Sequence, residues 1–139
     1  MDKCIAGFLG DYALLNPAYL EPCEYDGDIY PTIIMAVEAS KFDKLQRKVF
    51  QHGSARVATQ GYARPYTAKQ LEVLTELLKK RFAPGTKFRE CLDSTKGSDL
   101  VYSNEMHRNW YGSCTCDRCR ASVTHNYVGE ILERIRDGK

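Results

Sequence analysis

Residues 26 to 42 read Asp-Gly-Asp-Ile-Tyr-Pro-Thr-Ile-Ile-Met-Ala-Val-Glu-Ala-Ser-Lys-Phe, and this stretch decides most of the fold. Asp26-Gly27 predicts a tight hairpin turn, because glycine adopts the positive φ that such turns need. Pro31 cannot continue a ladder of strand hydrogen bonds, and the hydroxyl of Thr32 can cap the N-terminus of a helix. The sequence therefore predicts a hairpin that leads directly into a helix over residues 32–41.

The rest of the chain predicts helices and a few short strands. Thr67 opens the clearest helix, which runs to about Phe82 and ends before Pro84-Gly85. Other expected helices are 43–51, a short one from Ser54, 86–92 and one from Thr124; expected strands are 5–8, 12–15, 24–25, 29–30 and 100–102. The sequence thus predicts a single α+β domain over residues 1–139, mostly helical, with a small antiparallel sheet near the N-terminus.

Apolar spacing predicts which faces of these helices point inward. In the helix over 43–51, Leu45 and Val49 lie four residues apart and should share the inner face. In the last helix the inward residues should be Val128, Ile131, Leu132 and Ile135, with Gly138 just past its end.

The overall charge excludes strongly electrostatic functions. Twenty basic and 18 acidic side chains leave a net charge of +2, too near neutral to predict nucleic-acid or membrane binding. Short basic runs, such as 79–81, are interpreted as solvated surface. The sequence shows no signal peptide and no apolar run of about 18 residues. We therefore expect a soluble cytoplasmic protein, whose cysteines stay reduced.

Six cysteines are many for such a protein. Cys4, Cys23 and Cys91 are scattered, and we interpret each as a small buried apolar residue. Cys114, Cys116 and Cys119 are clustered, and the spacing of the last two is typical of a zinc knuckle. A structural zinc site would need a fourth ligand, for which the candidates are His107, His125, Cys23 and Cys91. A reduced thiol cluster without metal is the equal alternative.

Several motifs resemble the NADAR, or YbiA-like, family. The matching residues are Glu24-Tyr25-Asp26-Gly27, Tyr30-Pro31-Thr32, Ala39, Lys41, Phe42, His107, Asn109, Gly112, Cys114, Cys116, Cys119, Asn126, Gly129, Leu132, Ile135 and Arg136. The resemblance covers nearly the full length and implies the fold of that family. Asn126 and Gly129 are expected to allow close packing of the last helix.

The chain departs from the family pattern where the family is expected to do chemistry. The family's Glu-His pair is Ile34-Met35 here, its Asp is Arg108, and two of its Trp positions are Tyr66 and Tyr111. The resemblance implies that members bind an ADP-ribose-like ligand or ribosylated base and cleave an N-glycosidic bond. Because such cleavage needs a carboxylate beside the reacting sugar, Ile34 and Arg108 remove the expected groups.

Two functional hypotheses follow. The first is a catalytically inactive NADAR-like domain that serves as a binding, assembly or structural module for a protein partner. This hypothesis predicts no organic cofactor, and such a module would suit a phage-encoded protein. The second is an N-glycosidase that acts on ADP-ribosyl or related ribosylated-base substrates through a rebuilt site. Its candidate catalytic residues are Glu38, Glu105 and His107, and its candidate ligand-binding residues are Tyr66, Arg108 and Tyr111.

Overall fold

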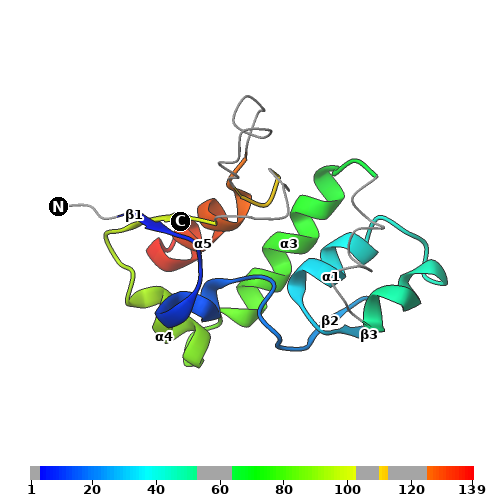
Figure 1. The fold of residues 1–139 in the computed structure, drawn as a ribbon, viewed down its shortest axis with the longest axis horizontal. Helices are drawn as coiled ribbons and strands as arrows, with labels where there is room; N and C mark the ends of the chain where they lie inside the picture. Colours follow the sequence, from blue (N-terminus) through cyan, green and yellow to red (C-terminus); the bar gives the residue numbers. More distant parts are fainter. Residues whose placement is uncertain (1–3, 53–63, 103–109, 113–124) are drawn as a thin grey trace. The chain divides into compact units, whose positions relative to one another are not determined.

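The computed structural model describes residues 4–52, 64–102, 110–112 and 125–139 (Figure 1). Contacts within the chain group these residues into two compact units. We call Pro17–Arg81 the middle unit, and Met1–Asn16 with Phe82–Lys139 the terminal unit. The prediction of one domain over residues 1–139 stays a prediction.

The middle unit begins with the predicted hairpin. Strands β2 (Cys23–Tyr25) and β3 (Asp28–Tyr30) pair antiparallel. The turn residues have positive φ, 51° at Asp26 and 85° at Gly27, as the Asp-Gly signal predicts for a primed turn. The hairpin prediction is confirmed.

Helix α1 (Ile33–Ala39) follows the hairpin at once. The hydroxyl of Thr32 accepts a hydrogen bond of 3.1 Å from the backbone N–H of Met35, which confirms the predicted cap. All seven residues of α1 are buried, because α3, η2 and the hairpin strands pack around the helix. A short helix that is buried on every side must satisfy each polar group it carries.

Helix α3 (Ala68–Arg81) is the long helix that Thr67 was predicted to open. The Thr67 hydroxyl accepts from the backbone N–H of Lys69, and the Gln70 side chain accepts from the backbone N–H of Thr67. This reciprocal arrangement is a capping box. The two helices α1 and α3 lie side by side in Figure 1.

The segment after α1 corrects a prediction. It forms a 3-10 helix, η2 (Gln46–His52), rather than the α-helix expected over 43–51. Leu45 and Val49 are 75% and 44% exposed, so the inward face assigned to them is wrong. The residues that point inward are Arg47 and Phe50, three apart, because a 3-10 helix repeats every three residues.

The terminal unit contains the second sheet. Strand β1 (Cys4–Ala6) pairs in parallel with β4 (Asp99–Val101), with Ile5 opposite Leu100. The strand expected over 12–15 is instead a 3-10 helix, η1 (Gly10–Leu15), closed by a hydrogen bond from Asn16 N–H to the Ala13 carbonyl. The antiparallel sheet of the middle unit therefore has two strands, and β1 belongs to a separate parallel pair.

The remaining helices of the terminal unit are both predicted, but the last one begins at Tyr127, later than the predicted start at Thr124. Helix α4 (Lys87–Asp93) is capped by the Thr86 hydroxyl, which accepts from the backbone N–H of Arg89 at 3.1 Å. Helix α5 (Tyr127–Asp137) ends at Gly138, whose φ of 73° is left-handed. Val128, Ile131 and Leu132 are buried and Ile135 is half-buried; Thr124 lies outside the described residues.

Helix α5 packs closely on β4 through a small set of residues. The Asn126 side chain accepts from Tyr102 N–H at 3.0 Å and donates to the Leu100 carbonyl at 2.7 Å. A Cβ atom on Gly129 would lie 2.0 Å from that same carbonyl oxygen, so only glycine fits there. The predicted structural role of Asn126 and Gly129 is confirmed.

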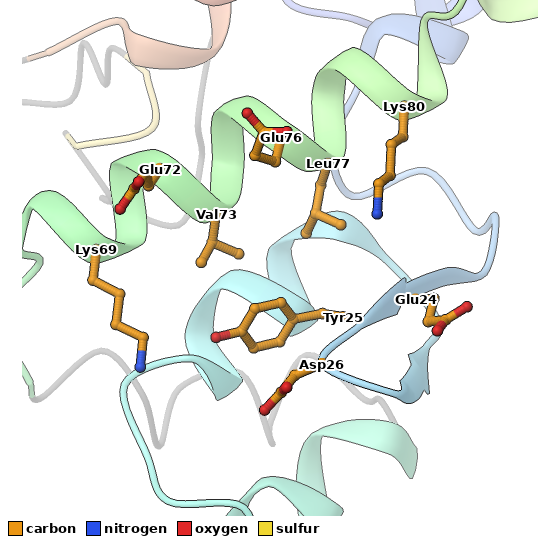
Figure 2. Close-up of a pocket in the computed structure, with 9 residues that line it drawn as sticks. All are labelled: Glu24, Tyr25, Asp26, Lys69, Glu72, Val73, Glu76, Leu77 and Lys80. Carbon is orange, nitrogen blue, oxygen red and sulfur yellow. The ribbon is translucent and has the colours of Figure 1, made fainter.

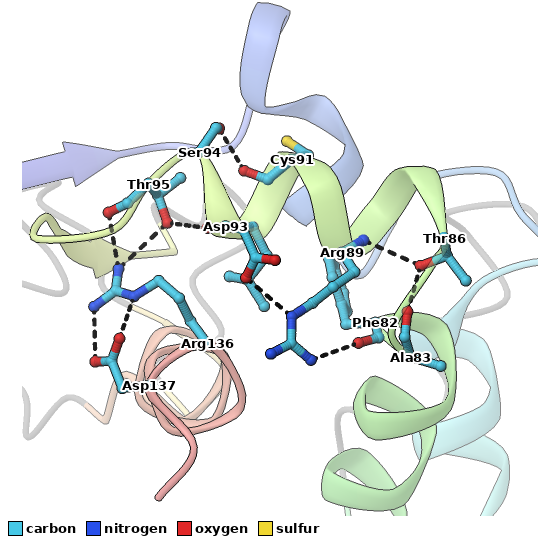
Figure 3. A network of polar contacts seen from close by, with 11 residues as sticks. Phe82, Ala83, Thr86, Arg89, Cys91, Asp93, Ser94, Thr95, Arg136 and Asp137 are labelled. Carbon is cyan, nitrogen blue, oxygen red and sulfur yellow. Dashed lines mark hydrogen bonds and ion pairs between the residues drawn. The ribbon is translucent and has the colours of Figure 1, made fainter.

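A buried arginine joins α5 to the turn that follows α4 (Figure 3). Arg136 is 8% exposed and donates to the carbonyl oxygens of Thr95 at 3.0 Å and Ser98 at 2.7 Å. Its other nitrogens donate to the Asp137 carboxylate, and this hydrogen bond raises the pKa of Arg136. None of the helices in the described part of the chain combines the length and apolar character of a membrane span.

Candidate functional site

Glu38, near the end of α1, is the candidate catalytic carboxylate that the structure describes. Its side chain is fully buried, and both carboxylate oxygens have partners. Oε1 lies 2.8 Å from the Nζ atom of Lys41, and Oε2 accepts a hydrogen bond of 2.7 Å from the hydroxyl of Tyr66. The structure thus brings together Glu38 and Tyr66, which the sequence had proposed for different roles.

Lys41 completes this cluster. Its ammonium group also donates to the Arg64 carbonyl at 2.9 Å and lies 3.4 Å from the centroid of the Tyr66 ring. The Lys41 side chain is only 2% exposed, so the ion pair with Glu38 is shielded from water and salt. Sequence reasoning missed this role, although the spacing of three residues between Glu38 and Lys41 is the ordinary signal for a helical ion pair.

A cleft of about 330 Å³ lies beside the cluster. Its lining residues are Ser40, Lys41, Arg64, Pro65, Thr67, Lys69 and Gln70. Lys41 therefore reaches the cleft wall, whereas Glu38 is not among the residues that line it. The lining supplies cationic and hydroxyl groups and no carboxylate, which suits contact with an anionic or polar group better than acid–base chemistry.

The floor of this cleft is fixed by a chain of hydrogen bonds between α1 and α3. The Gln70 side chain donates to the Ser40 hydroxyl at 3.1 Å and accepts from the Thr67 hydroxyl at 2.7 Å. The Ser40 hydroxyl donates in turn to the Val37 carbonyl at 2.6 Å. Ser40 and Gln70 are buried, so these bonds hold the two helices in one fixed arrangement.

Tyr66 and Tyr111, the two tyrosines among the candidate ligand-binding residues, have different surroundings. Tyr66 is half-buried, and the ammonium group of Lys41 lies over its ring. Tyr111 belongs to the terminal unit, is fully buried and packs edge-on against Trp110 with ring centroids 4.9 Å apart. The described position of Tyr111 is thus that of a core side chain.

The other predicted site residues lie outside the described residues. These are Glu105, His107, Arg108, Cys114, Cys116 and Cys119. The structural zinc site and the rebuilt acid–base group therefore stay predictions. In the part of the chain that the structure describes, no three His, Cys, Asp or Glu side chains come together to hold a metal ion.

The described cysteines differ from the interpretation as buried apolar residues. Cys4, the first residue of strand β1, is exposed. The interpretation as a buried residue is therefore wrong for Cys4. Cys23 and Cys91 are half-buried, and each thiol donates to a backbone carbonyl. Burial raises the pKa of the Cys23 thiol, against the opposing effect of Arg81 and Lys80, and favours the protonated form.

Comparison with known proteins identifies a similar solved structure. No family model matches the sequence, and no curated protein matches it either. The solution NMR structure of the Escherichia coli protein YbiA superimposes with a TM-score of 0.76, covering 99% of this chain and 85% of the YbiA chain at 21% sequence identity. The chain has a YbiA-like fold.

The YbiA-like fold confirms what the sequence motifs implied about architecture. At 21% identity the likeness shows the fold alone. It does not test the substitutions at the expected catalytic positions. Two of those positions are described: Ile34 and Met35 are 3% and 6% exposed. Both side chains are thus part of the apolar core of the middle unit.

Proposed function

We propose that this YbiA-like domain has no N-glycosidase activity and acts as a binding or assembly module for a protein partner, inside the cell or in a phage particle. The burial of Glu38 carries the proposal. Its two oxygens are engaged by Lys41 and Tyr66, and it does not line the neighbouring cleft. A carboxylate in this position supports the fold and has no free oxygen for a sugar or an attacking water.

Ile34 supports the same conclusion. The family resemblance expects a glutamate at this position, and here an isoleucine fills it in the core. An isoleucine side chain can neither accept a proton nor stabilise an oxocarbenium-like state. The scaffold is retained, because the hairpin, the Thr32 cap and the close packing at Gly129 are all present.

The proposal is tested by an N-glycosidase assay on ADP-ribosylated bases, with an active NADAR-family enzyme as the positive control. We expect turnover no faster than the uncatalysed reaction for the wild-type chain. We also expect millimolar ADP-ribose to leave the thermal midpoint unchanged, since a ligand that binds the native state must raise it. Wild-type turnover that is lost in Glu38→Gln would overturn the proposal.

A loss of stability in Glu38→Gln could imitate a loss of activity, so a second variant is needed. Arg136→Met removes a buried charge from the terminal unit and should destabilise the chain by a similar amount without touching the cleft. Activity is then compared at equal folded fraction. Turnover that survives Arg136→Met but disappears in Glu38→Gln would identify Glu38 as a working carboxylate.

One observation favours the second function, an N-glycosidase with a rebuilt site. Glu38 and Tyr66 converge on Lys41, and Lys41 lines the cleft. The Tyr66 hydroxyl donates to the Glu38 carboxylate at 2.7 Å, so the two groups lie within the hydrogen-bond reach that an acid–base pair requires. In that case a thermal shift with ADP-ribose should disappear in both Tyr66→Phe and Glu38→Gln.

A further inference from the structure

A second hollow lies in the middle unit, between α3 and the β2–β3 hairpin (Figure 2). It measures about 320 Å³, and its lining surface is more apolar than polar. Tyr25, Val73 and Leu77 form its apolar floor, and six charged side chains form its rim: Glu24, Asp26, Lys69, Glu72, Glu76 and Lys80. We call this hollow the hairpin groove.

The rim charges are ordered along the groove. Lys69 and Lys80, at the two ends of the α3 side, extend toward the hairpin, and the positive charge of Lys69 contributes to lowering the Asp26 pKa (Figure 2). Glu72 and Glu76 lie between them on the same helix. The α3 rim therefore has positive ends and a negative centre.

The central carboxylates are available to a partner. Glu72 and Glu76 are both exposed, and Glu72 makes no ion pair with any described residue. Glu76 has only a 4.0 Å contact with Lys79, between side chains that are each more than half exposed. Exposed pairs of this kind contribute little to stability, so a cationic ligand can replace this contact.

The hairpin already shows how this part of the chain holds a guanidinium group. Arg47 donates to the Asp26 carboxylate at 2.7 Å, and its guanidinium carbon lies 5.1 Å from the centroid of the Tyr25 ring. A carboxylate and an aromatic ring thus act on one arginine. In the groove, Val73 and Leu77 point toward the Tyr25 ring and offer an apolar surface for an aliphatic stem (Figure 2). Glu72 and Glu76 belong to the α3 side of the rim, next to this apolar surface.

From this charge order we propose that the hairpin groove binds an extended segment of the partner protein, with an arginine or lysine at its centre and an acidic residue two positions away on either side. The inference rests on the proposed binding role and names the chemistry of the partner. Eleven helical residues separate Lys69 and Lys80, or about 16 Å. An extended segment of about five residues spans that length.

The test is an NMR titration of the ¹⁵N-labelled chain with the peptide acetyl-Glu-Ala-Arg-Ala-Glu-amide at low salt. We expect saturable shifts of the backbone amides of Tyr25, Val73 and Leu77. The control peptide acetyl-Arg-Glu-Ala-Ala-Glu-amide has the same composition and net charge in another order. It should bind roughly five- to tenfold more weakly, since two exposed charge pairs are lost.

Variants separate the groove from general surface charge. Glu72→Gln with Glu76→Gln should weaken the first peptide roughly five- to tenfold. Glu130→Gln, which removes an exposed carboxylate from α5 in the terminal unit, should leave its affinity unchanged. No shifts at millimolar peptide, shifts at other amides, or equal affinity for the two peptides would overturn the inference.

The two proposals fail in different measurements. If the peptide does not bind the hairpin groove and the chain has no N-glycosidase turnover, the inference is overturned and the proposed function is not affected. Turnover that depends on Glu38 overturns the proposed function, whatever the peptide does.

Discussion

Arg136 in the terminal unit and Glu38 in the middle unit are both buried charged side chains, but their partners differ in kind. Arg136 in the terminal unit donates to two backbone carbonyls of the turn after α4 and to Asp137 (Figure 3). Glu38 in the middle unit accepts from two side chains, Lys41 and Tyr66. Arg136 is thus bound mainly to the backbone, whereas Glu38 is bound to side chains that a substitution can remove.

The difference shows what burial alone can say about function. Backbone carbonyls at Thr95 and Ser98 are present whatever the sequence, so Arg136 has a structural role that needs no further partner. The partners of Glu38 include Lys41, which lines a cleft. A change at Glu38 therefore alters the stability of the middle unit and removes the group that neutralises Lys41 beside the cleft.

The largest effect should come from the close contact that fixes α5 on β4. In Gly129→Ala the new Cβ would meet the Leu100 carbonyl at 2.0 Å and the Asn126 side chain at 2.4 Å. We expect a loss of about 4 kcal/mol in the free energy of unfolding, measured by urea denaturation. The neighbouring exposed substitution Glu130→Ala should cost less than about 0.5 kcal/mol. Equal effects would mean that the contact does not hold the terminal unit together.

Arg136→Met tests the backbone-bound charge. It leaves the carbonyls of Thr95 and Ser98 without their donor, and we expect a loss of about 3 kcal/mol in the free energy of unfolding. Arg134→Met on the exposed side of the same helix is the matched control and should change little. A small effect in both variants would show that the backbone hydrogen bonds of Arg136 do not stabilise the terminal unit.

Glu38→Gln tests the side-chain-bound charge. The amide keeps the shape and one acceptor oxygen, but Lys41 loses the carboxylate that neutralises it, so we expect a loss of about 2 kcal/mol. Glu72→Gln, an exposed carboxylate of α3, serves as the control. If Lys41→Met is combined with Glu38→Gln, the double variant should lose less than the sum of the two single losses. Additive losses would show that the pair is not coupled.

The smallest effect concerns Asp26 at the hairpin turn. The hydrogen bond from Arg47 lowers the pKa of Asp26. The stabilisation from this pair is therefore present above the unfolded carboxyl pKa of about 3.9 and is lost as the pH falls through the lower folded pKa. NMR titration should show the Asp26 pKa rising in Arg47→Gln. An unchanged pKa would mean that the pair contributes nothing to the hairpin.

The sequence predicted those parts of the fold that depend on neighbouring residues. The Asp26-Gly27 turn and the roles of Thr32 and Thr67 at the starts of their helices were predicted correctly, because each uses contacts within three residues along the chain. The prediction of a strand over 12–15 was wrong, since four apolar residues in a row suit a short strand and a helical turn equally well. The parallel pairing of β1 with β4 joins residues about ninety apart, and no local pattern encodes it.

The candidate site was predicted in part for the same reason. Glu38 was singled out from its place on α1, but its burial depends on Tyr66, 28 residues later. Tyr66 was named only as a candidate ligand-binding residue, because an aromatic residue in a sequence does not reveal whether its hydroxyl has a buried partner. The hairpin groove was not foreseen at all, since the charges of α3 resemble those of any solvated helix until the hairpin lies opposite them.

The complete burial of α1 has a consequence for how this domain can evolve. Restoring a glutamate at Ile34 would place a charge in the core with no partner ready for it, and the chain would be expected to lose stability before any activity appeared. A carboxylate at this position would need a buried donor beside it before it could be tolerated. Such a change therefore requires a second substitution elsewhere in the core of the middle unit, and a single substitution is not enough.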